Sequence, residues 1–392
     1  MKRILLQGST GSIGNSALSV IEVNEEHFCV AGLSAGHKER ELLAQARRWK
    51  PESLALLKPS DEAKFRSAAY EIGVAKIFTG PDAFTRQAEE LEYDLLLNAV
   101  MGSAGVLPTF AALRKSVNVA LSNKETLVAA GELVMACARD HGATILPIDS
   151  EHSALYQCLQ GERISDVRKL WLTTSGGPFW NRKPDTLQFV SPNEALSHPT
   201  WTMGPKITID SATLFNKGLE VIEACRLFDV SIEKVEVVRQ RESVIHSMVE
   251  FIDGSFKAQL STPDMRLPIL YSLSHPVRIA SNIVSTAPNR IEALHFDEVD
   301  IECYPCLKVA FHAASAGGTA PAILSAADEV AVESFLAGQI RFTAIAELIE
   351  ESLNTLEITP ADSIEVVMEA DRKSRVLVGE LVKEYTGSTI LN

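Results

Sequence analysis

The chain has 392 residues, 46% of them apolar, and its 37 basic against 51 acidic residues leave a formal charge of −14. This balance argues against nucleic acid as a partner, because no run of Lys and Arg is long enough to make a basic binding face. No apolar run reaches the roughly 18 to 20 residues of a bilayer span, so we expect no membrane partner. The segment after Met1-Lys2-Arg3 turns polar too soon for a signal peptide. Six scattered cysteines suit a reducing compartment, and we expect a cytoplasmic protein of two or three domains.

The N-terminal half alternates strand-like and helical patterns. This alternation predicts an α/β fold with a doubly wound, Rossmann-type sheet. Ligands bind such a sheet at the carboxyl ends of its strands, so the chemistry is expected in the residues that follow each strand. The strand-like runs are residues 2–7, 28–33, 53–57, 76–79, 95–100, 117–121 and 144–148.

The first strand leads into the glycine-rich turn Gly8-Ser-Thr-Gly-Ser-Ile-Gly14, and a helical pattern follows. Glycines let the backbone approach a phosphate closely, and a helix N-terminus attracts negative charge. A GxxGxxG string by itself also occurs in ordinary tight turns. Its place between the first strand and a helix favours a dinucleotide-binding domain.

The turn after the second strand, Ser34-Ala35-Gly36-His37-Lys38, lacks the acidic residue that an NAD site uses to bind the ribose 2′-hydroxyl. Lys38 instead favours NADP, whose 2′-phosphate requires donors and positive charge. The alternative is that His37 and Lys38 are solvated loop residues.

Two carboxylates follow the apolar run 145–148, in the string Asp149-Ser150-Glu151-His152. Their spacing can direct both at one hard cation, Mg²⁺ or Mn²⁺, and no zinc-type set of His and Cys accompanies them. An equally good explanation is that Asp149 or Ser150 caps the helix that follows. The metal interpretation therefore requires a third carboxylate.

The segment 206–223 is expected to be a strand that runs into a helix. At about 100° per residue, Asn216, Lys217 and Glu220 share one face of that helix, and apolar residues take the other. A solvated surface would give the same pattern. Ser211 and Thr213 at the helix start favour instead a site for phosphate oxygens.

Two loops between these segments have no regular period. Thr173–Phe179 is a turn rich in serine and glycine. Ser197–Pro205 is broken by proline and glycine and carries His198, Trp201 and Met203, as a lid that closes on a substrate would. The alternative for this second loop is an ordinary connection with a packed Trp201.

Several separated strings together resemble the 1-deoxy-D-xylulose 5-phosphate reductoisomerase family over nearly the whole chain. The resemblance implies an NADPH- and divalent-metal-dependent enzyme of the non-mevalonate (MEP) isoprenoid pathway. Such an enzyme rearranges 1-deoxy-D-xylulose 5-phosphate, a small phosphorylated sugar, and reduces it to 2-C-methyl-D-erythritol 4-phosphate. The resemblance also implies that the protein is a homodimer. The strings are Gly8–Gly14, Ser122–Glu125, Pro147–His152, Ser175–Phe179, His198–Trp201, Asp210–Glu220, Ser243–Met248, Thr262–Arg266 and Tyr304–Lys308.

The resemblance also implies roles for single residues. Asp149, Glu151 and Glu220 are the implied metal ligands, which supplies the third carboxylate. Ser175, Ser211, Asn216 and Lys217 are the implied phosphate contacts. His198 and Trp201 close over the substrate, Lys124 and Ser150 contact its backbone, and Lys124 also influences proton transfer. The implied NADPH contacts are Thr10, Gly11, Ser12, Ile13, Gly36, His37, Lys38, Asn123, Glu125 and Gly204.

Two points stay open. The family more often has a basic residue at position 37 and asparagine at 38, so His37-Lys38-Glu39 leaves the 2′-phosphate partners unassigned. His246 lies in a matching string, as either a substrate contact or a structural residue.

We expect four consecutive parts, the last of them helical because apolar residues recur at helix spacing after Pro321. Two other functions stay possible from the residues alone: an NADP-dependent dehydrogenase of another phosphorylated aldehyde or ketone, and a non-catalytic NADP-sensing protein. The expected parts are an NADPH-binding Rossmann-type domain (1–150), a catalytic α/β domain with a lid near 197–205 (151–274), a linker (275–302) and a C-terminal helical domain (303–392).

Overall fold

The computed structural model describes residues 1–197, 203–291 and 293–389, without the side chains of 386–389. The chain forms two compact units, each made of several stretches. The predicted boundaries of the functional domains stay a prediction. Unit 1 comprises Met1–Thr126, Val134–Ser153 and Asp264–Thr286, and unit 2 comprises Leu127–Leu133, Ala154–Pro263 and Ala287–Asn392.

Within the described ranges, unit 1 is built on a parallel sheet of seven strands in the order β4-β3-β2-β1-β5-β6-β7. The predicted strands are confirmed, with ends that differ by at most two residues. The order reverses between β1 and β5, which makes the carboxyl ends of this pair the place where a ligand is expected. The strands are β1 Lys2–Gln7, β2 Phe28–Ala35, β3 Ser53–Leu56, β4 Lys76–Thr79, β5 Leu95–Asn98, β6 Asn118–Leu121 and β7 Ile145–Pro147.

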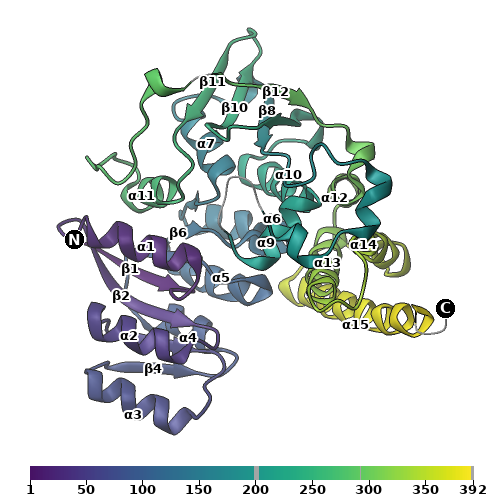
Figure 1. Cartoon of the computed structure of the whole chain (residues 1–392). Coiled ribbons are helices and arrows are strands. Elements are labelled where there is room, and N and C mark those ends of the chain that lie inside the picture. Colours follow the sequence, from purple (N-terminus) through teal and green to yellow (C-terminus); the bar gives the residue numbers. More distant parts are fainter. Residues whose placement is uncertain (198–202, 292, 390–392) are drawn as a thin grey trace. The chain divides into compact units, whose positions relative to one another are not determined.

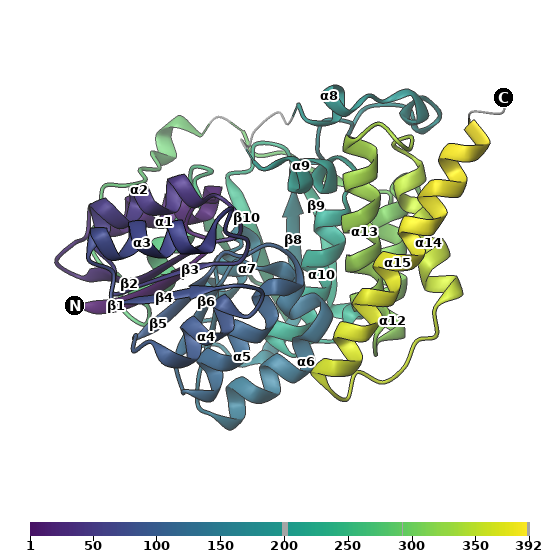
Figure 2. The same cartoon turned by 90° about the horizontal axis from the view of Figure 1, so that it is seen from below.

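Helices cover both faces of this sheet, with α1, α2 and α3 on one side of the strands and α4 and α5 on the other (Figure 2). The strands are therefore buried on both faces, and Ile4, Leu5 and Leu6 of β1 are fully enclosed. Helices α6 and α7 have residues in both units. The helices are α1 Ser12–Glu22, α2 Glu39–Trp49, α3 Glu62–Ile72, α4 Ala83–Glu90, α5 Val106–Arg114, α6 Lys124–Asp140, α7 Ser150–Cys158 and α11 Arg266–Ser274.

Helix α11 joins unit 1 from a distant part of the sequence. It packs against α1 and against β6 and β7. The hydroxyl of Ser272 donates to the carbonyl of Pro147 (3.1 Å), and the ammonium of Lys2 donates to the carbonyl of Leu273 (2.8 Å). Polar contacts thus fix both the last strand and the first strand of the sheet to α11.

The described part of unit 2 combines a five-stranded sheet, in the order β11-β10-β8-β9-β12, with a helical C-terminal region (Figure 1). Strands β8 and β9 are parallel, and the other pairs are antiparallel. This confirms the predicted mixed α/β class with C-terminal helices. The elements are β8 Val167–Thr174, α8 Pro192–Ala195, α9 Pro205–Ala212, α10 Phe215–Phe228, β9 Val235–Gln240, β10 Ile245–Phe251, β11 Phe256–Leu260, β12 Phe296–Glu298, α12 Pro305–Ala316, α13 Ala320–Leu336, α14 Ala344–Thr355 and α15 Ile364–Thr389.

Helix α10 contributes to two hydrophobic cores of unit 2. Val221 and Ala224 pack with the strands of the five-stranded sheet. Phe215, Leu219 and Ile222 pack with the C-terminal helices. The helix is therefore held on both sides, which fixes the polar residues that it also carries.

One predicted element is wrong. The segment 206–210 was expected to be a strand, but it lies inside helix α9, which begins at Pro205 and ends at Ala212. Proline at the first helical position has a suitable φ and needs no hydrogen-bond partner for its missing N–H, and Gly204 provides the N-cap. The turn into α10 follows at Leu214, whose φ is +55°.

Within the described ranges, no helix has both the length and the apolar character that crossing a bilayer requires.

Gly218 lets α10 and α12 approach closely, because a Cβ at this position would overlap the Cβ of Ala310. We expect Gly218→Ala to lower the free energy of unfolding by about 1 to 3 kcal/mol, as overpacking does. Adding Ala310→Gly should recover part of this loss, although glycine itself costs up to about 1 kcal/mol in a helix. Urea denaturation of Gly218→Ala and of the double variant, each compared with the unsubstituted protein, measures the loss and its recovery. Gly379→Ala, at a helical site with open space, is the control and should not be destabilising.

Candidate active site

The glycine turn after β1 requires a backbone without side chains. Gly8 has a φ of +80°, and a Cβ there would overlap the carbonyl of Ala99, just after β5. A Cβ at Gly14 would overlap the backbone of the same turn. Helix α1 begins at Ser12 with Gly11 as its N-cap, and both residues are exposed. The turn therefore lies at the switch point of the sheet and leads into an exposed helix N-terminus without a side-chain cap, as a dinucleotide site requires.

The turn after β2 is open to solvent. His37 and Lys38 are exposed and Gly36 is half-buried. The ammonium of Lys38 lies 3.5 Å from the carboxylate of Glu41 at the surface. This exposure fits both a 2′-phosphate site and a solvated loop, so the role of these residues stays a prediction.

Asn123 is buried, and its side chain is engaged within unit 1. Its amide donates to the carbonyls of Val100 (2.8 Å) and Gly102 (2.9 Å) and to the carboxylate of Glu125 (2.9 Å). Its oxygen accepts from the backbone N–H of Thr126, which caps α6. The residue thereby joins the loops that follow β5 and β6, the edge at which a cofactor would bind.

The two carboxylates after β7 lie where the sequence predicted them. Asp149 follows the strand, and Glu151 lies in the first turn of α7. The Asp149 carboxylate contacts the ammonium of Lys124 and lies 3.0 Å from Nδ1 of His152. The hydroxyl of Ser150 donates to Glu151 (2.5 Å).

Asp149 is held in its ionised form. Burial alone would raise the pKa of its carboxyl, but the Lys124 ammonium and the hydrogen bond to His152 outweigh burial and hold the pKa well below its usual range. An ionised, partly buried carboxylate with Glu151 two residues further on is an oxygen donor set that fits a hard divalent cation. His152 received no role from the sequence, although its i,i+3 spacing from Asp149 was a usable signal.

In unit 2, the turn after β8 lies against the end of α9. Gly177 has a φ of +67°, and a Cβ there would lie 2.5 Å from the backbone oxygen of Ser211. The neighbouring Gly176 also has a positive φ. The turn that follows Ser175 therefore touches the backbone of Ser211, and these two serines are predicted phosphate contacts.

The polar face of α10 is not a solvated surface. Lys217 and Glu220 are buried, with 3% and 0% of their surface exposed. Both Asn216 and Lys217 donate hydrogen bonds to the Glu220 carboxylate. The structure thus brings three predicted site residues together in one buried polar network, and this excludes the alternative of a solvated face for Lys217 and Glu220.

Other predicted residues are placed less directly. His198 and Trp201 lie outside the described residues. Gly204 is the N-cap of α9. His246 is buried in β10, and its Nε2 lies 2.9 Å from the hydroxyl of Ser261 beyond β11, which indicates a structural contact.

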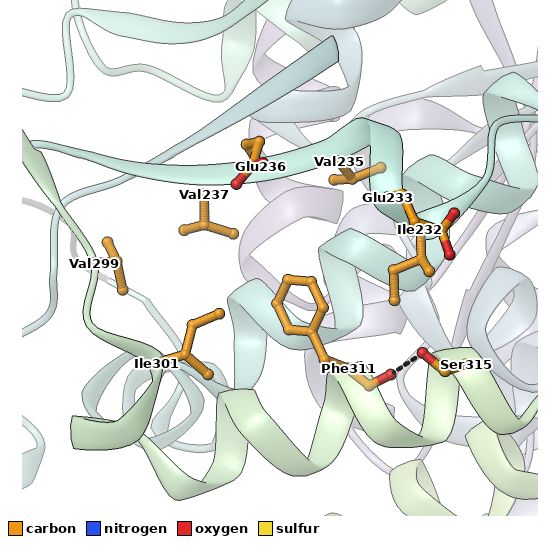
Figure 3. A pocket seen from close by; sticks show the side chains of 9 residues that line it. All are labelled: Ile232, Glu233, Val235, Glu236, Val237, Val299, Ile301, Phe311 and Ser315. Atoms are coloured by element: carbon orange, nitrogen blue, oxygen red, sulfur yellow. Dashed lines mark hydrogen bonds between the residues drawn. The ribbon is translucent and has the colours of Figure 1, made fainter.

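A separate pocket of about 350 Å³ lies in unit 2 between β9 and α12 (Figure 3). Apolar side chains such as Val235, Val237 and Phe311 line it. The hydroxyl of Ser315, which also lines it, donates to the carbonyl of Phe311 (3.0 Å). Because its lining includes none of the predicted site residues that the structure describes, we do not assign this pocket as the candidate active site.

The fold and these residues define a class of protein. A Rossmann-type sheet with a phosphate-compatible glycine turn, an ionised aspartate after β7 and a buried Asn-Lys-Glu network in unit 2 are features of a nucleotide-dependent oxidoreductase.

Comparisons with known proteins identify the family. The protein-family model described as "1-deoxy-D-xylulose 5-phosphate reductoisomerase" matches residues 4–131. Two family models for C-terminal domains of the same enzyme match residues 145–228 and 260–377. The enzyme of that name from Listeria monocytogenes is 45% identical over 97% of this chain and 100% of its own length. That from Chlorobium phaeobacteroides is 45% identical over 98% and 100%. The chain therefore belongs to the 1-deoxy-D-xylulose 5-phosphate reductoisomerase family, and the predicted oxidoreductase class is confirmed.

Solved structures of this family have the same fold. A reductoisomerase in complex with NADPH, fosmidomycin and magnesium superposes with a TM-score of 0.92 at 38% identity, over 98% of both chains. The enzyme from Zymomonas mobilis in complex with NADPH gives a TM-score of 0.90 at 38% identity, over 97% of this chain and 99% of that one.

The contact between Gly177 and Ser211 can be tested with two glycines of positive φ. We expect Gly177→Ala to raise the KM for 1-deoxy-D-xylulose 5-phosphate about tenfold or more, because the added Cβ pushes the turn away from α9. The control is Gly254→Ala, where φ is +85° but the space is open. It should cost only about 1 kcal/mol of stability and leave KM unchanged. Equal KM values for both variants would contradict the expected arrangement.

Proposed function

We propose that this chain converts 1-deoxy-D-xylulose 5-phosphate to 2-C-methyl-D-erythritol 4-phosphate with NADPH and Mg²⁺ or Mn²⁺, in the MEP pathway. Family membership and relatives solved with NADPH and magnesium support this function. The observation that carries it in this chain is the ionised Asp149 beside Glu151 at the carboxyl end of the Rossmann-type sheet.

The proposed metal ligands are Asp149, Glu151 and Glu220. Their donor atoms are all carboxylate oxygens, which suit Mg²⁺ and Mn²⁺ better than zinc. When bound, the ion supplies a Lewis acid that polarises substrate oxygens. Lys124 keeps Asp149 ionised, so this ligand needs no deprotonation before it binds.

The proposed phosphate site consists of Ser175, Ser211, Asn216 and Lys217. Hydroxyls, an amide and an ammonium are all donors, and phosphate oxygens accept several hydrogen bonds at once. Lys217 has three N–H groups, so it can keep its bond to Glu220 and also donate to a phosphate. The network on α10 thereby links the phosphate contacts to a metal ligand.

The remaining proposed roles orient the substrate and exclude water. Lys124 and Ser150 contact the substrate backbone, and the Lys124 ammonium holds a proton next to Asp149. His198 and Trp201 close over the bound substrate. Removal of water strengthens the hydrogen bonds of Lys124 and Lys217 to the reacting molecule.

The proposed NADPH site begins at the glycine turn after β1, where backbone N–H groups donate hydrogen bonds to the pyrophosphate. The end of β2 carries no acidic residue, which removes the repulsion that a 2′-phosphate would meet. Asn123 and Glu125 hold the neighbouring loops in place. The proposed contacts are Thr10, Gly11, Ser12, Ile13, Gly36, His37, Lys38, Asn123, Glu125 and Gly204.

We also propose that the protein is a cytoplasmic homodimer. The scattered free cysteines support a reducing compartment. The mass of one chain is 42.7 kDa, so light scattering that gives this mass at micromolar concentration would contradict the dimer.

Removal of the metal tests the proposed function. We expect NADPH oxidation with 1-deoxy-D-xylulose 5-phosphate to stop after exhaustive treatment with EDTA and to return on addition of Mg²⁺ or Mn²⁺, because rearrangement requires the cation. Absorbance at the nicotinamide band measures the rate. Unchanged turnover without metal would instead favour a metal-independent NADP dehydrogenase. No turnover in either state would favour a protein that only binds NADP.

The ligand role of Glu220 is tested by Glu220→Gln. We expect kcat to fall by about 10³-fold or more, because a neutral amide no longer balances the charge of the cation or of Lys217. NADPH binding, measured by fluorescence titration, should stay within about twofold of the unchanged chain. Glu236→Gln, which breaks a surface ion pair with Lys169, is the matched control and should keep full activity. A fully active Glu220→Gln variant would exclude the ligand role.

A further inference from the structure

A second set of buried charged groups lies in unit 2, apart from the residues assigned above. Asp210 on α9 and Asp328 on α13 are buried, with 2% and 0% of their surface exposed. The ammonium of Lys206 lies 2.7 Å from an oxygen of each carboxyl. Because both oxygens lie against the same nitrogen, the two carboxyl groups are neighbours. The cluster therefore adds a polar connection between α9 and α13, two helices that also contribute to the same hydrophobic core.

The hydrogen bonds of this cluster do not balance if both acids are ionised. The Oδ1 atoms of Asp210 and Asp328 receive no hydrogen bond from any residue that the structure describes. Two carboxylates in contact supply only acceptors, and a buried acceptor without a donor costs about 1 to 3 kcal/mol. A single proton between the two groups would turn this contact into a hydrogen bond.

The groups around the pair do not supply the missing charge. Glu329 follows Asp328 on α13 and adds a negative charge, and α12 contributes the uncharged thiol of Cys306. On α15, Arg375 is bound to Glu329 (2.9 Å) and to Asp371 (2.8 Å). Among the residues that the structure describes, Lys206 is thus the cation that faces the pair directly.

The expected ionisation agrees with this geometry. Burial, and then the charge of Asp210, raise the pKa of the Asp328 carboxyl well above its usual range. Burial also raises the pKa of Asp210, although Lys206 opposes it. Two like charges in contact cannot both form without a large cost, so one proton stays with the pair.

We propose that Asp210 and Asp328 share one proton, and that Asp328 is a positioning residue which, through this bond and Lys206, fixes the end of α9 that carries Ser211. The inference rests on the proposed role of Ser211 in phosphate binding. Asp210 immediately precedes Ser211, and the turn at Gly177 lies against the Ser211 backbone. A shift of this end of α9 therefore displaces both Ser211 and the turn that carries Ser175, which are proposed phosphate contacts.

The sign of the pH dependence follows from the raised pKa. In water an aspartic acid loses its proton at about pH 4, whereas the folded pair keeps one proton to higher pH. Over that interval the folded protein binds more protons than the unfolded chain, so stability falls as pH rises through the pKa of the pair. When the proton is lost, two negative carboxylates face the single ammonium of Lys206 and repel each other. This repulsion loosens α9 and weakens substrate binding.

Infrared spectroscopy of the protein without substrate tests the shared proton directly. We expect the difference spectrum between the unchanged chain and Asp328→Asn at neutral pH to contain the C=O stretching band of one protonated carboxylic acid. This readout does not depend on the proposed function. If the spectrum contains no such band, the shared proton is excluded.

Kinetics test the positioning role. Asparagine supplies an amide N–H in place of the proton, so Asp328→Asn should keep KM for 1-deoxy-D-xylulose 5-phosphate within about twofold near neutral pH. Asp328→Ala should raise this KM about tenfold or more, with a much smaller change in kcat. Glu333→Gln, an exposed carboxylate on the same helix, is the control and should leave KM unchanged.

The pH profile separates positioning from a purely structural role. As the pH is raised from about 5 to 9, KM of the unsubstituted protein should increase relative to KM of Asp328→Asn. The ratio of the two KM values is compared because titration of the substrate's own phosphate affects both equally. A constant ratio, or an Asp328→Ala variant with the KM of the control, would overturn the positioning role. If Ser211→Ala leaves KM unchanged, the proposed phosphate site fails instead, while the infrared band still decides the shared proton.

Discussion

The candidate site in unit 2 depends on the burial of charge on a helix that is already packed on two sides. Helix α10 gives Val221 and Ala224 to one core and Phe215, Leu219 and Ile222 to the other. Its remaining face holds Lys217 and Glu220 away from water. Charges in such a place are stable only when each has a partner, because removing one ion from water costs several kcal/mol. The Lys217–Glu220 pair must therefore form for α10 to occupy its position between the two cores. A ligand that enters the site must likewise leave each buried charge with a partner.

In unit 1, the proposed cofactor site depends instead on a turn whose glycines lack side chains. The turn at Gly8 lies so close to the backbone after β5 that no side chain fits, and the exposed N-terminus of α1 follows it at the switch point. A site for a large cofactor is thus formed mainly by the main chain, whereas Asp149 and Lys124 add charge at one place only. The net charge of −14 does not oppose an anionic ligand when attraction is so local.

Much of this structure could be predicted because its signals are local in sequence. The buried parallel strands of unit 1 are short apolar runs between helices, and their ends were predicted to within two residues. The segment 206–210 was assigned incorrectly because its alternation of polar and apolar residues fits a strand, and five residues are too few to show the period of a helix. Only Pro205 and Gly204 distinguish the two, as the start of a helix.

The burial of single side chains could not be predicted in this way. Lys217 and Glu220 have the spacing of a solvated helix face, and only the packing of α10 between two cores shows that they are enclosed. The carboxyl groups of Asp210 and Asp328 come from helices far apart in the sequence. Their contact arises from tertiary structure, which leaves no periodic trace in the sequence.

The attachment of α11 to the first strand has a consequence for synthesis of the protein. Lys2 is among the first residues made, yet its ammonium binds the carbonyl of Leu273, which is 271 positions further along the chain. Most strands of unit 1 leave the ribosome long before α11 exists, so the early sheet has an uncovered apolar surface over β6 and β7. Contacts of such long range form late and slowly. Unit 1 is therefore complete only when about three quarters of the chain has been translated, and until then its nascent form is a natural substrate for chaperones.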